Sequence, residues 1–341
     1  MPRYRLTIAY DGTDFCGWQK QELFLPPPDA RPADQRPPDR ETTTPVPRPG
    51  KLAGATTLDI RDGEDRPRTA LRTVQHVVEQ SVRAIVREDV ILTGASRTDT
   101  GVHAKGQVAA FTCSPADVPP RRDRAADFDS SLLPPEPEEP PGPSTPRGPG
   151  WPLDRGTGRL LRAINSRLPD DILVVACEPT SPDFDPIQHA TSKAYSYTLH
   201  VGPPPPHGLG LRPLWDRRYV HHVWEPLDLD RMERATAHLV GEHDFAAFAA
   251  AGHGRLSTVR TILSCTVTEL SPVTESRRLR IDVSGTGFLW NMVRILAGTL
   301  VDVGRARIDP DAVPAIIASR DRRAAGPTLP PTGLCLEWIR Y

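Results

Sequence analysis

Prolines gather in two stretches of this sequence, and their placement limits which residues can build a folded core. Of the 39 prolines in 341 residues, 10 lie in residues 22–70 and 12 lie in residues 115–157. Proline has no backbone N–H to donate and clashes with the preceding helical turn, so neither stretch can form a long helix or a central strand. We therefore predict two insertions at loop positions of a globular protein. Each insertion is interpreted as a disordered linker or, alternatively, as an arm that contacts a partner.

Charge and cysteine placement narrow the class of protein. Outside the two insertions the net charge is +3, against −1 for the whole chain, which permits a polyanionic partner without requiring one. The five cysteines form no C-x-x-C pair and the histidines no H-E-x-x-H pair, so we expect neither a metal site nor disulfides. No apolar run is long enough to span a membrane, and the N-terminus is typical of a strand, not of a signal peptide. We expect a soluble, cytoplasmic protein.

With the insertions set aside, the first half has a β-α-β-β-α-β order of predicted elements. Alternating β-forming residues predict strands, and apolar residues repeated every three or four positions predict helices. This order is typical of a ferredoxin-like unit, an antiparallel sheet with two helices on one face. The predicted strands cover residues 3–9, 90–95, 106–113 and 172–177, and the predicted helices cover residues 71–87 and 158–168.

The second half is again a mixture of helices and strands. We predict an α+β fold of two ferredoxin-like halves, residues 1–182 and 183–341, with antiparallel or mixed sheets, flanking helices and an active-site cleft between them. Residues 243–245 are interpreted as the end of a helix packed under that cleft. The predicted strands cover residues 194–201, 257–270, 277–284 and 333–340, and the predicted helices cover residues 229–239, 288–303 and 309–318.

The densest group of polar and small residues is the run GASRTDTGVHA at positions 94–104. It holds Asp99 between two predicted strands, and Gly101 allows the backbone to approach another group closely. A carboxylate presented in this way is a candidate nucleophile or base. Alternatively, Asp99 caps a turn and pairs with Arg97. The triplet Asp99-Thr100-Gly101 also matches the D-T-G of aspartic proteases, but those enzymes need two such aspartates and this chain has one.

Seven blocks of the sequence, in order, resemble the tRNA pseudouridine synthase A family, which acts on the anticodon stem-loop of tRNA. Together they span nearly the whole chain outside the insertions, which are long for this family. The blocks are Tyr10–Gln19, Arg97–Ala104, Leu168–Ile172, Phe184–Tyr197, Gly241–Phe248, Gly287–Arg294 and Gly326–Leu334.

The resemblance implies isomerisation of uridine to pseudouridine at tRNA positions 38, 39 and 40. The N1–C1′ bond breaks, the base rotates, and C5 bonds to C1′. No group is imported and no electrons are exchanged, so no cofactor or metal is expected. The family works as a homodimer with tRNA crossing both subunits, and we expect the same here. The competing hypotheses are an RNA-binding module without activity and, much less well supported, the aspartic protease.

The same resemblance assigns roles to four residues. Asp99 is the catalytic residue, which attacks C1′ as a nucleophile or takes the C2′ proton; the sequence leaves both routes open. Arg294 is the basic partner of Asp99, because an arginine in an apolar helix requires a carboxylate. Tyr195 stacks on the uracil, and Arg97 fills the space left by the flipped nucleotide. The alternatives are a solvated Arg294, an ordinary strand tyrosine at 195 and an ion-paired Arg97.

Overall fold

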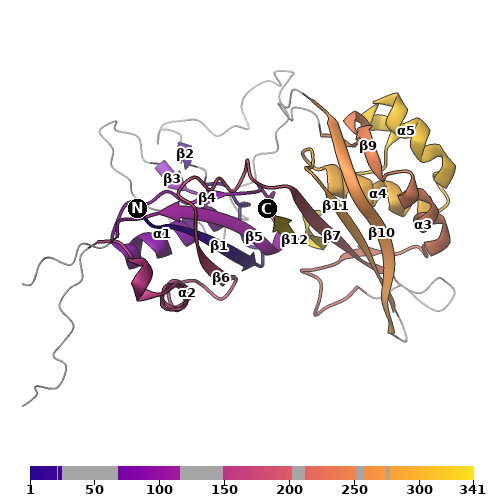
Figure 1. The fold of residues 1–341 in the computed structure, drawn as a ribbon. Coiled ribbons are helices and arrows are strands. Elements are labelled where there is room, and N and C mark those ends of the chain that lie inside the picture. Colours follow the sequence, from indigo (N-terminus) through magenta and orange to yellow (C-terminus); the bar gives the residue numbers. More distant parts are fainter. Residues whose placement is uncertain (21, 25–67, 116–148, 202–211, 251–256, 274–275) are drawn as a thin grey trace, which may run out of the picture.

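The computed structural model describes residues 1–20, 22–24, 68–115, 149–201, 212–250, 257–273 and 276–341. Most of the two predicted insertions, residues 25–67 and 116–148, therefore lies outside the described residues. The fold is α+β, as predicted, and one large mixed sheet runs the length of the molecule (Figure 1). None of the helices in the described ranges is both long and apolar enough to cross a bilayer.

Ten strands form the large sheet, in the order β6-β1-β5-β12-β7-β11-β10-β9, with β4 also paired to β5 and β8 to β7. Their pairing is antiparallel except where β12 meets β5 and where β8 meets β7. The short strands β2 (Glu22–Phe24) and β3 (Arg68–Ala70) form a separate pair. The ten strands are β1 (Arg3–Tyr10), β4 (Thr93–Gly94), β5 (His103–Thr112), β6 (Ile172–Thr180), β7 (Ser192–Val201), β8 (His221–Val223), β9 (Gly241–Asp244), β10 (Val259–Val273), β11 (Ser276–Gly285) and β12 (Leu334–Arg340).

The helices lie in two groups. Helices α1 and α2 accompany strands β1, β5 and β6, whereas α3, α4 and α5 gather beside β9, β10 and β11 (Figure 1). Apolar residues at helical spacing explain the packing, as in α1, where Val74, Val78 and Val82 are completely buried. The bounds are α1 (Val74–Val86), α2 (Thr157–Asn165), α3 (Leu229–Ala237), α4 (Met292–Gly304) and α5 (Val313–Ser319).

The last strand of the chain joins the strands of the first half to those of the second. Strand β12 pairs with β5 through Cys335 and His103 and with β7 through Leu336 and Tyr195. Side chains along a strand point alternately to the two faces of the sheet. Tyr195 therefore lies on one face and its neighbour Ser196 on the other, so the same three strands supply side chains to two separate regions.

Several helices and strands differ in type or bounds from those predicted, and each difference has a local cause. The predicted helix end at residues 243–245 is wrong, because Gly241–Asp244 is the strand β9, which pairs with β10. Gly241 has a φ of +116°, which lets the chain turn into that strand after α3. The helix predicted from residue 288 begins only at Met292, because Asn291 before it has a φ of +60°. The strand predicted over residues 90–95 is only β4, over which the ring of Trp18 packs against Gly94.

Part of the second predicted insertion belongs to the core. Trp151 is 2% exposed, and its carbonyl accepts a 2.8 Å hydrogen bond from the Tyr4 hydroxyl on β1. A buried aromatic ring of this size contributes substantially to the core. Residues 149–156 therefore form a structured approach to α2, and this part of the second predicted insertion is not a linker.

Candidate active site

The loop between β4 and β5 carries Asp99, and neighbouring segments hold its backbone in place. The Thr98 carbonyl accepts a 3.0 Å hydrogen bond from the Trp18 N–H, and the Thr98 hydroxyl lies 2.8 Å from the Tyr10 hydroxyl. Gly17 makes this approach possible, because a Cβ there would lie 2.7 Å from the Thr98 oxygen. The family-like block at the end of β1 thus supports the loop, which gives the Asp99 backbone a fixed position.

A buried glutamine fixes the start of the same loop. Gln107 on β5 is completely buried, and its amide donates to the Ser96 carbonyl at 2.6 Å and accepts from the Ser96 N–H at 3.2 Å. The Ser96 hydroxyl in turn lies 3.0 Å from the Tyr195 hydroxyl on β7. A residue of the first half is therefore linked directly to the predicted substrate-stacking residue of the second half.

The Asp99 carboxylate meets two donors from the start of α4. Arg294 Nη1 lies 3.5 Å from Asp99 Oδ2, and the Trp290 indole N–H donates to Asp99 Oδ1 at 3.1 Å. The side chain of Asp99 is 37% exposed, whereas that of Arg294 is 16% exposed. The predicted neighbours Asp99 and Arg294, 195 residues apart in sequence, are thus brought together. The carboxylate stays accessible and its cation is mostly covered.

Arg294 is oriented by contacts other than the one to Asp99. Its Nε donates to the Leu329 carbonyl at 2.6 Å, and its Nη1 donates to Asn291 Oδ1 at 2.7 Å. Asp99 is the one carboxylate paired with it in the part of the chain that the structure describes. Two neutral acceptors therefore hold the guanidinium, and its charge faces the carboxylate of Asp99. This excludes the alternative of a solvated Arg294.

Tyr195 is 7% exposed and lies within the sheet. Burial raises the pKa of its phenol to about 12, despite the hydrogen bond with Ser96, and the nearby Asp99 charge adds to the rise. Its ring makes an edge-to-face contact with Phe288 at 5.3 Å between centroids. Tyr195 is therefore protonated at neutral pH and offers a hydroxyl, not a phenolate, to the site.

Arg97 behaves differently from the other predicted site residues. Its side chain is exposed, and it makes no hydrogen bond or ion pair with any residue that the structure describes. The alternative in which Arg97 pairs with Asp99 is therefore not what the described residues show. Trp290 lies in the family-like block Gly287–Arg294, but the resemblance gives it no role. The only sequence signal for Trp290 is its position one helical turn before Arg294.

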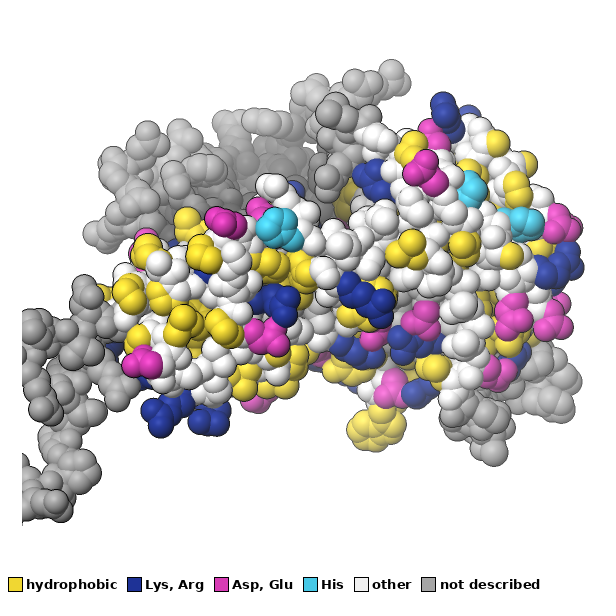
Figure 2. Space-filling model, viewed as in Figure 1, with side chains coloured by type: hydrophobic (Ala, Val, Ile, Leu, Met, Phe, Trp, Pro, Cys, Tyr) yellow, Lys and Arg dark blue, Asp and Glu magenta, His cyan; other side chains and the backbone are white. Residues whose placement is uncertain are grey.

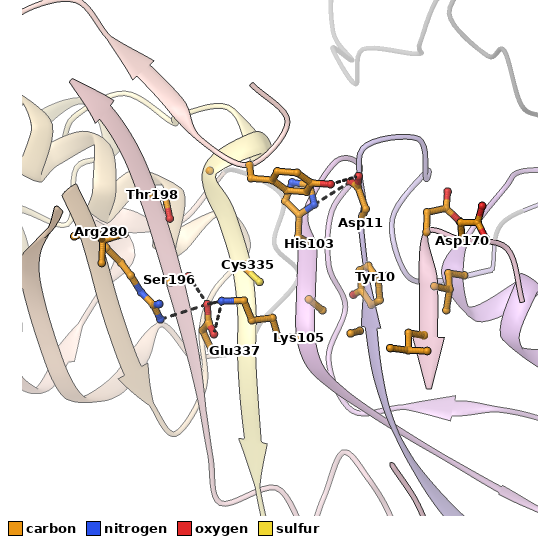
Figure 3. Close-up of a pocket in the computed structure, with 18 residues that line it drawn as sticks. Tyr10, Asp11, His103, Lys105, Asp170, Ser196, Thr198, Arg280, Cys335 and Glu337 are labelled. Atoms are coloured by element: carbon orange, nitrogen blue, oxygen red, sulfur yellow. Dashed lines mark hydrogen bonds and ion pairs between the residues drawn. The ribbon is translucent and has the colours of Figure 1, made fainter. Parts of the chain in front are cut away.

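A second polar cluster lies where β12 meets β5 and β7, around the carboxylate of Glu337 (Figure 3). A cavity of about 480 Å³ is lined by Glu337 of β12 together with Ser196, Arg280 and Lys105. Glu337 accepts hydrogen bonds from Ser196 at 2.6 Å and from Lys105 at 3.0 Å, and lies 3.3 Å from Arg280. Asp99 does not line this cavity. The carboxylate of Glu337 is already fully paired, so we do not assign catalysis to it.

The other wall of this cavity holds His103, four residues after Asp99. The Gly12 N–H donates to His103 Nδ1 at 3.1 Å, and His103 Nε2 lies 2.8 Å from the Arg218 carbonyl. Burial lowers the pKa of His103, against the opposing effect of Asp11. A neutral imidazole with its proton on Nε2 satisfies both contacts. His103 therefore fastens the end of the loop that carries Asp99 to two other segments.

These observations describe an accessible carboxylate, Asp99, held beside a covered arginine, Arg294. Among the described residues there is no cluster of three or more His, Cys, Asp or Glu side chains that could hold a metal ion. The aspartic-protease hypothesis loses its support, because Asp99 is paired with an arginine and not with a second aspartate.

Comparison with known proteins identifies the family. A family model described as tRNA pseudouridine synthase matches residues 235–341. The chain is 34% identical to the tRNA pseudouridine synthase A of Pelobacter propionicus and 33% identical to that of Ruminiclostridium cellulolyticum, in each case over 100% of both chains. It is 31% identical to the tRNA pseudouridine synthase A 2 of Clostridium perfringens, again over the whole of both chains. The chain belongs to the tRNA pseudouridine synthase A family, whose members are isomerases of uridine in tRNA.

Proposed function

We propose that this protein forms pseudouridine at positions 38, 39 and 40 in the anticodon stem-loop of tRNA, with Asp99 as its catalytic residue. The observation that carries this proposal is the accessible Asp99 carboxylate, which is held by donors from Trp290 and Arg294. In the reaction the N1–C1′ bond breaks and a C5–C1′ bond forms. The proton lost from C5 is balanced by one gained at N1. The conversion is therefore an isomerisation that needs no cofactor or metal.

Asp99 acts in its ionised form on either route. As a nucleophile it attacks C1′, and as a base it removes the C2′ proton. Arg294 supports both routes, because a nearby cation stabilises the ionised carboxylate once RNA has displaced water from the site. Its neutral hydrogen-bond partners Leu329 and Asn291 keep that cation in place without neutralising it.

Tyr195 and Arg97 handle the substrate in this proposal. Tyr195 lies at the site with a protonated hydroxyl, which fits contact with the uracil ring and assistance in proton transfer at C5. Arg97 is exposed and unengaged by the described residues, which fits a guanidinium that enters the helix when the uridine leaves it. Such a contact offsets an unstacking cost of roughly a few kcal/mol.

We also propose that the chain consists of two ferredoxin-like halves, residues 1–182 and 183–341, with the active site between them. The strand orders β6-β1-β5-β4 and β12-β7-β11-β10 support this division, because each matches the order 4-1-3-2 of such a unit. We also propose that the protein works in the cytoplasm, where its tRNA substrate is found.

The proposed assembly is a homodimer with tRNA crossing both subunits. Basic and acidic side chains are interspersed on the face drawn in Figure 2, so this face offers little net charge for binding a whole tRNA. Leu173 and Val175 of the edge strand β6 are 52% and 47% exposed, and exposed apolar side chains of this kind suit a protein contact. Both features support association of two copies.

The test of substrate and position is pseudouridine mapping in tRNA from cells that lack this protein. We expect pseudouridine to disappear at positions 38–40 and nowhere else. Expression of the wild-type chain should restore it, and expression of Asp99→Asn should not. Unchanged pseudouridine at these positions, with loss at another site, would show that the protein acts elsewhere in RNA. Restoration by Asp99→Asn would remove Asp99 from the mechanism and leave the non-catalytic RNA-binding module as the better account.

A further inference from the structure

Trp290 has an unusual position for a large apolar side chain. It is 47% exposed, yet its indole N–H is bonded to the carboxylate of Asp99 at 3.1 Å. Its backbone is fixed as well, because its carbonyl accepts a 3.1 Å hydrogen bond from Ala250 and Asn291 follows it with a φ of +60°. The residue is therefore held at the start of α4 in an orientation that directs the N–H toward the loop.

Other exposed tryptophans do not share this feature. Trp224 is 52% exposed and Trp215 is 87% exposed, and for neither does the structure give the indole N–H an acceptor among the described residues. Trp151, which is buried, donates only to the Gly156 carbonyl at 3.3 Å. The contact of Trp290 with an ionisable group therefore cannot be explained as a general property of tryptophans in this protein.

Arg294 contacts only one oxygen of the Asp99 carboxylate, and Trp290 donates to the other. Arg294 makes its shorter hydrogen bonds to Leu329 and Asn291, and its distance to Asp99 Oδ2 is 3.5 Å. The Trp290 N–H reaches the other oxygen, Oδ1, at 3.1 Å. Donors on two different oxygens restrict rotation of the carboxylate, which a single donor would permit. A neutral N–H also favours the ionised form without adding a second positive charge.

We propose that Trp290 is a positioning residue for Asp99, which fixes the plane of the carboxylate and favours its ionised form. This inference rests on the proposed function, because it has meaning only if Asp99 is catalytic. Arg294 of α4 is paired with Asp99, and the Asp99 charge acts on Tyr195 of β7. Lys193 of β7 lies 3.5 Å from the Ser96 hydroxyl in the same loop, which also carries the exposed Arg97. Substitution of Trp290 changes none of these groups. A shift in the pH dependence of kcat would therefore come from loss of the indole N–H.

The experiment compares Trp290→Phe and Trp290→His with the wild type and with Trp224→Phe as the control of equal exposure. Pseudouridine formation is followed on an anticodon stem-loop RNA, with kcat and KM measured across pH. A hydrogen bond to a charged group contributes about 1.5–3 kcal/mol, and about 1.4 kcal/mol corresponds to tenfold in rate. We therefore expect kcat of Trp290→Phe to fall roughly ten- to a hundredfold at neutral pH, with KM nearly unchanged.

The pH profile separates positioning from a merely structural role. Loss of a donor to the ionised form favours protonation, so the acidic limb of kcat should move to higher pH. Trp290→His retains a ring N–H and should recover part of both effects, while Trp224→Phe should match the wild type. If Trp290→Phe does not fold, as judged by its thermal transition, the Trp290→His pH profile carries the test.

Three results would overturn the proposal. One is a wild-type kcat and acidic limb in Trp290→Phe. The second is a rise in KM alone, which would make Trp290 a surface that binds RNA. The third is a fall in kcat with an unmoved acidic limb and no recovery in Trp290→His. Absence of pseudouridine formation by the wild-type protein would instead refute the proposed function, so the two failures are distinguishable.

Discussion

Two carboxylates near the junction of β5, β12 and β7 have opposite surroundings. Glu337 is 13% exposed and contacts Ser196, Lys105 and Arg280, with the closest oxygen distances between 2.6 and 3.3 Å. Asp99 is 37% exposed and has one cation, at 3.5 Å, and one neutral N–H. Adjacent residues of β7 contact the two regions. Ser196 donates a hydrogen bond to Glu337, and Tyr195 is hydrogen-bonded to Ser96 in the loop that carries Asp99.

Under the proposed function, this difference separates a structural carboxylate, Glu337, from a reactive one, Asp99. The charge of Glu337 is already balanced, so reaction there would break contacts that join β12 to β5, β7 and β11. Asp99 has a cation close enough to favour its ionised form, but keeps an exposed surface for a substrate. The volume of a hollow is therefore a poor guide to chemistry in this protein, because the cavity beside Glu337 is substantial and Asp99 lies outside it.

The largest difference between the two carboxylates is expected when Asp99 is neutralised. In Asp99→Asn, pseudouridine formation should fall to less than about one thousandth of the wild-type rate, as expected for loss of a nucleophile or base. Folding and tRNA binding should be nearly intact, because the amide keeps the shape of the side chain. The measurement is single-turnover pseudouridine formation, with thermal unfolding and tRNA binding as controls. Activity close to that of the wild type would contradict the assignment.

Removal of the cation should have the next largest effect. In Arg294→Met, we expect kcat to fall roughly a hundred- to a thousandfold, as for loss of a preorganised charge at a reaction centre. The acidic limb of the pH–rate profile should also move to higher pH, because protonation of Asp99 becomes easier.

Arg305 provides a matched control for Arg294. It follows the same helix α4, is 17% exposed and pairs with Glu225. Arg305→Met should lower stability without moving the pH profile. Equal pH profiles for Arg294→Met and the wild type would show that the ion pair with Asp99 does not matter for the reaction.

Neutralisation of Glu337 should lower stability and leave activity unchanged, the reverse of the result expected for Asp99. In Glu337→Gln, the free energy of unfolding should fall by about 1–3 kcal/mol. Lys105 loses its charged partner, and Arg280, which also pairs with Asp282, loses one of its two. Urea denaturation measures this loss, and the rate of pseudouridine formation in the folded variant should match that of the wild type. A variant of normal stability with much reduced activity would mean that the two carboxylates share the chemistry.

The smallest expected effect concerns His103, which lies between the two regions. Its pKa is lowered in the fold, whereas an unfolded histidine titrates near 6.5. As the pH falls below about 6.5, the unfolded chain therefore takes up this proton more readily and the native state loses stability. His103→Gln should lack this contribution, so its loss of Tm between pH 7.5 and 5 should be smaller. His221 and His222, whose pKa values burial also lowers, should leave a residual slope in both proteins. Identical pH dependence would show that His103 is not held neutral.

The sequence predicted strongly patterned elements well and tertiary detail less well. The strand pair β10 and β11 was predicted as such, because alternation continues over many residues. Strand β9 was mistaken for a helix end, because four residues carry too little periodicity to distinguish the two. Asp99 and Arg294 came from the family resemblance, and the structure brings them together. Trp290 has its position only through the turn at Asn291, which local sequence does not reveal.

The most direct test of the account is tritium release from anticodon stem-loops labelled at C5 of a single uridine. The C5–C1′ bond can form only if C5 loses its hydrogen, so release at a labelled position reports the reaction there. The account predicts release by the wild-type protein from uridines 38, 39 and 40, matched by pseudouridine at the same position, and no release by Asp99→Asn. No release from any of the three, or equal release by Asp99→Asn, would contradict it.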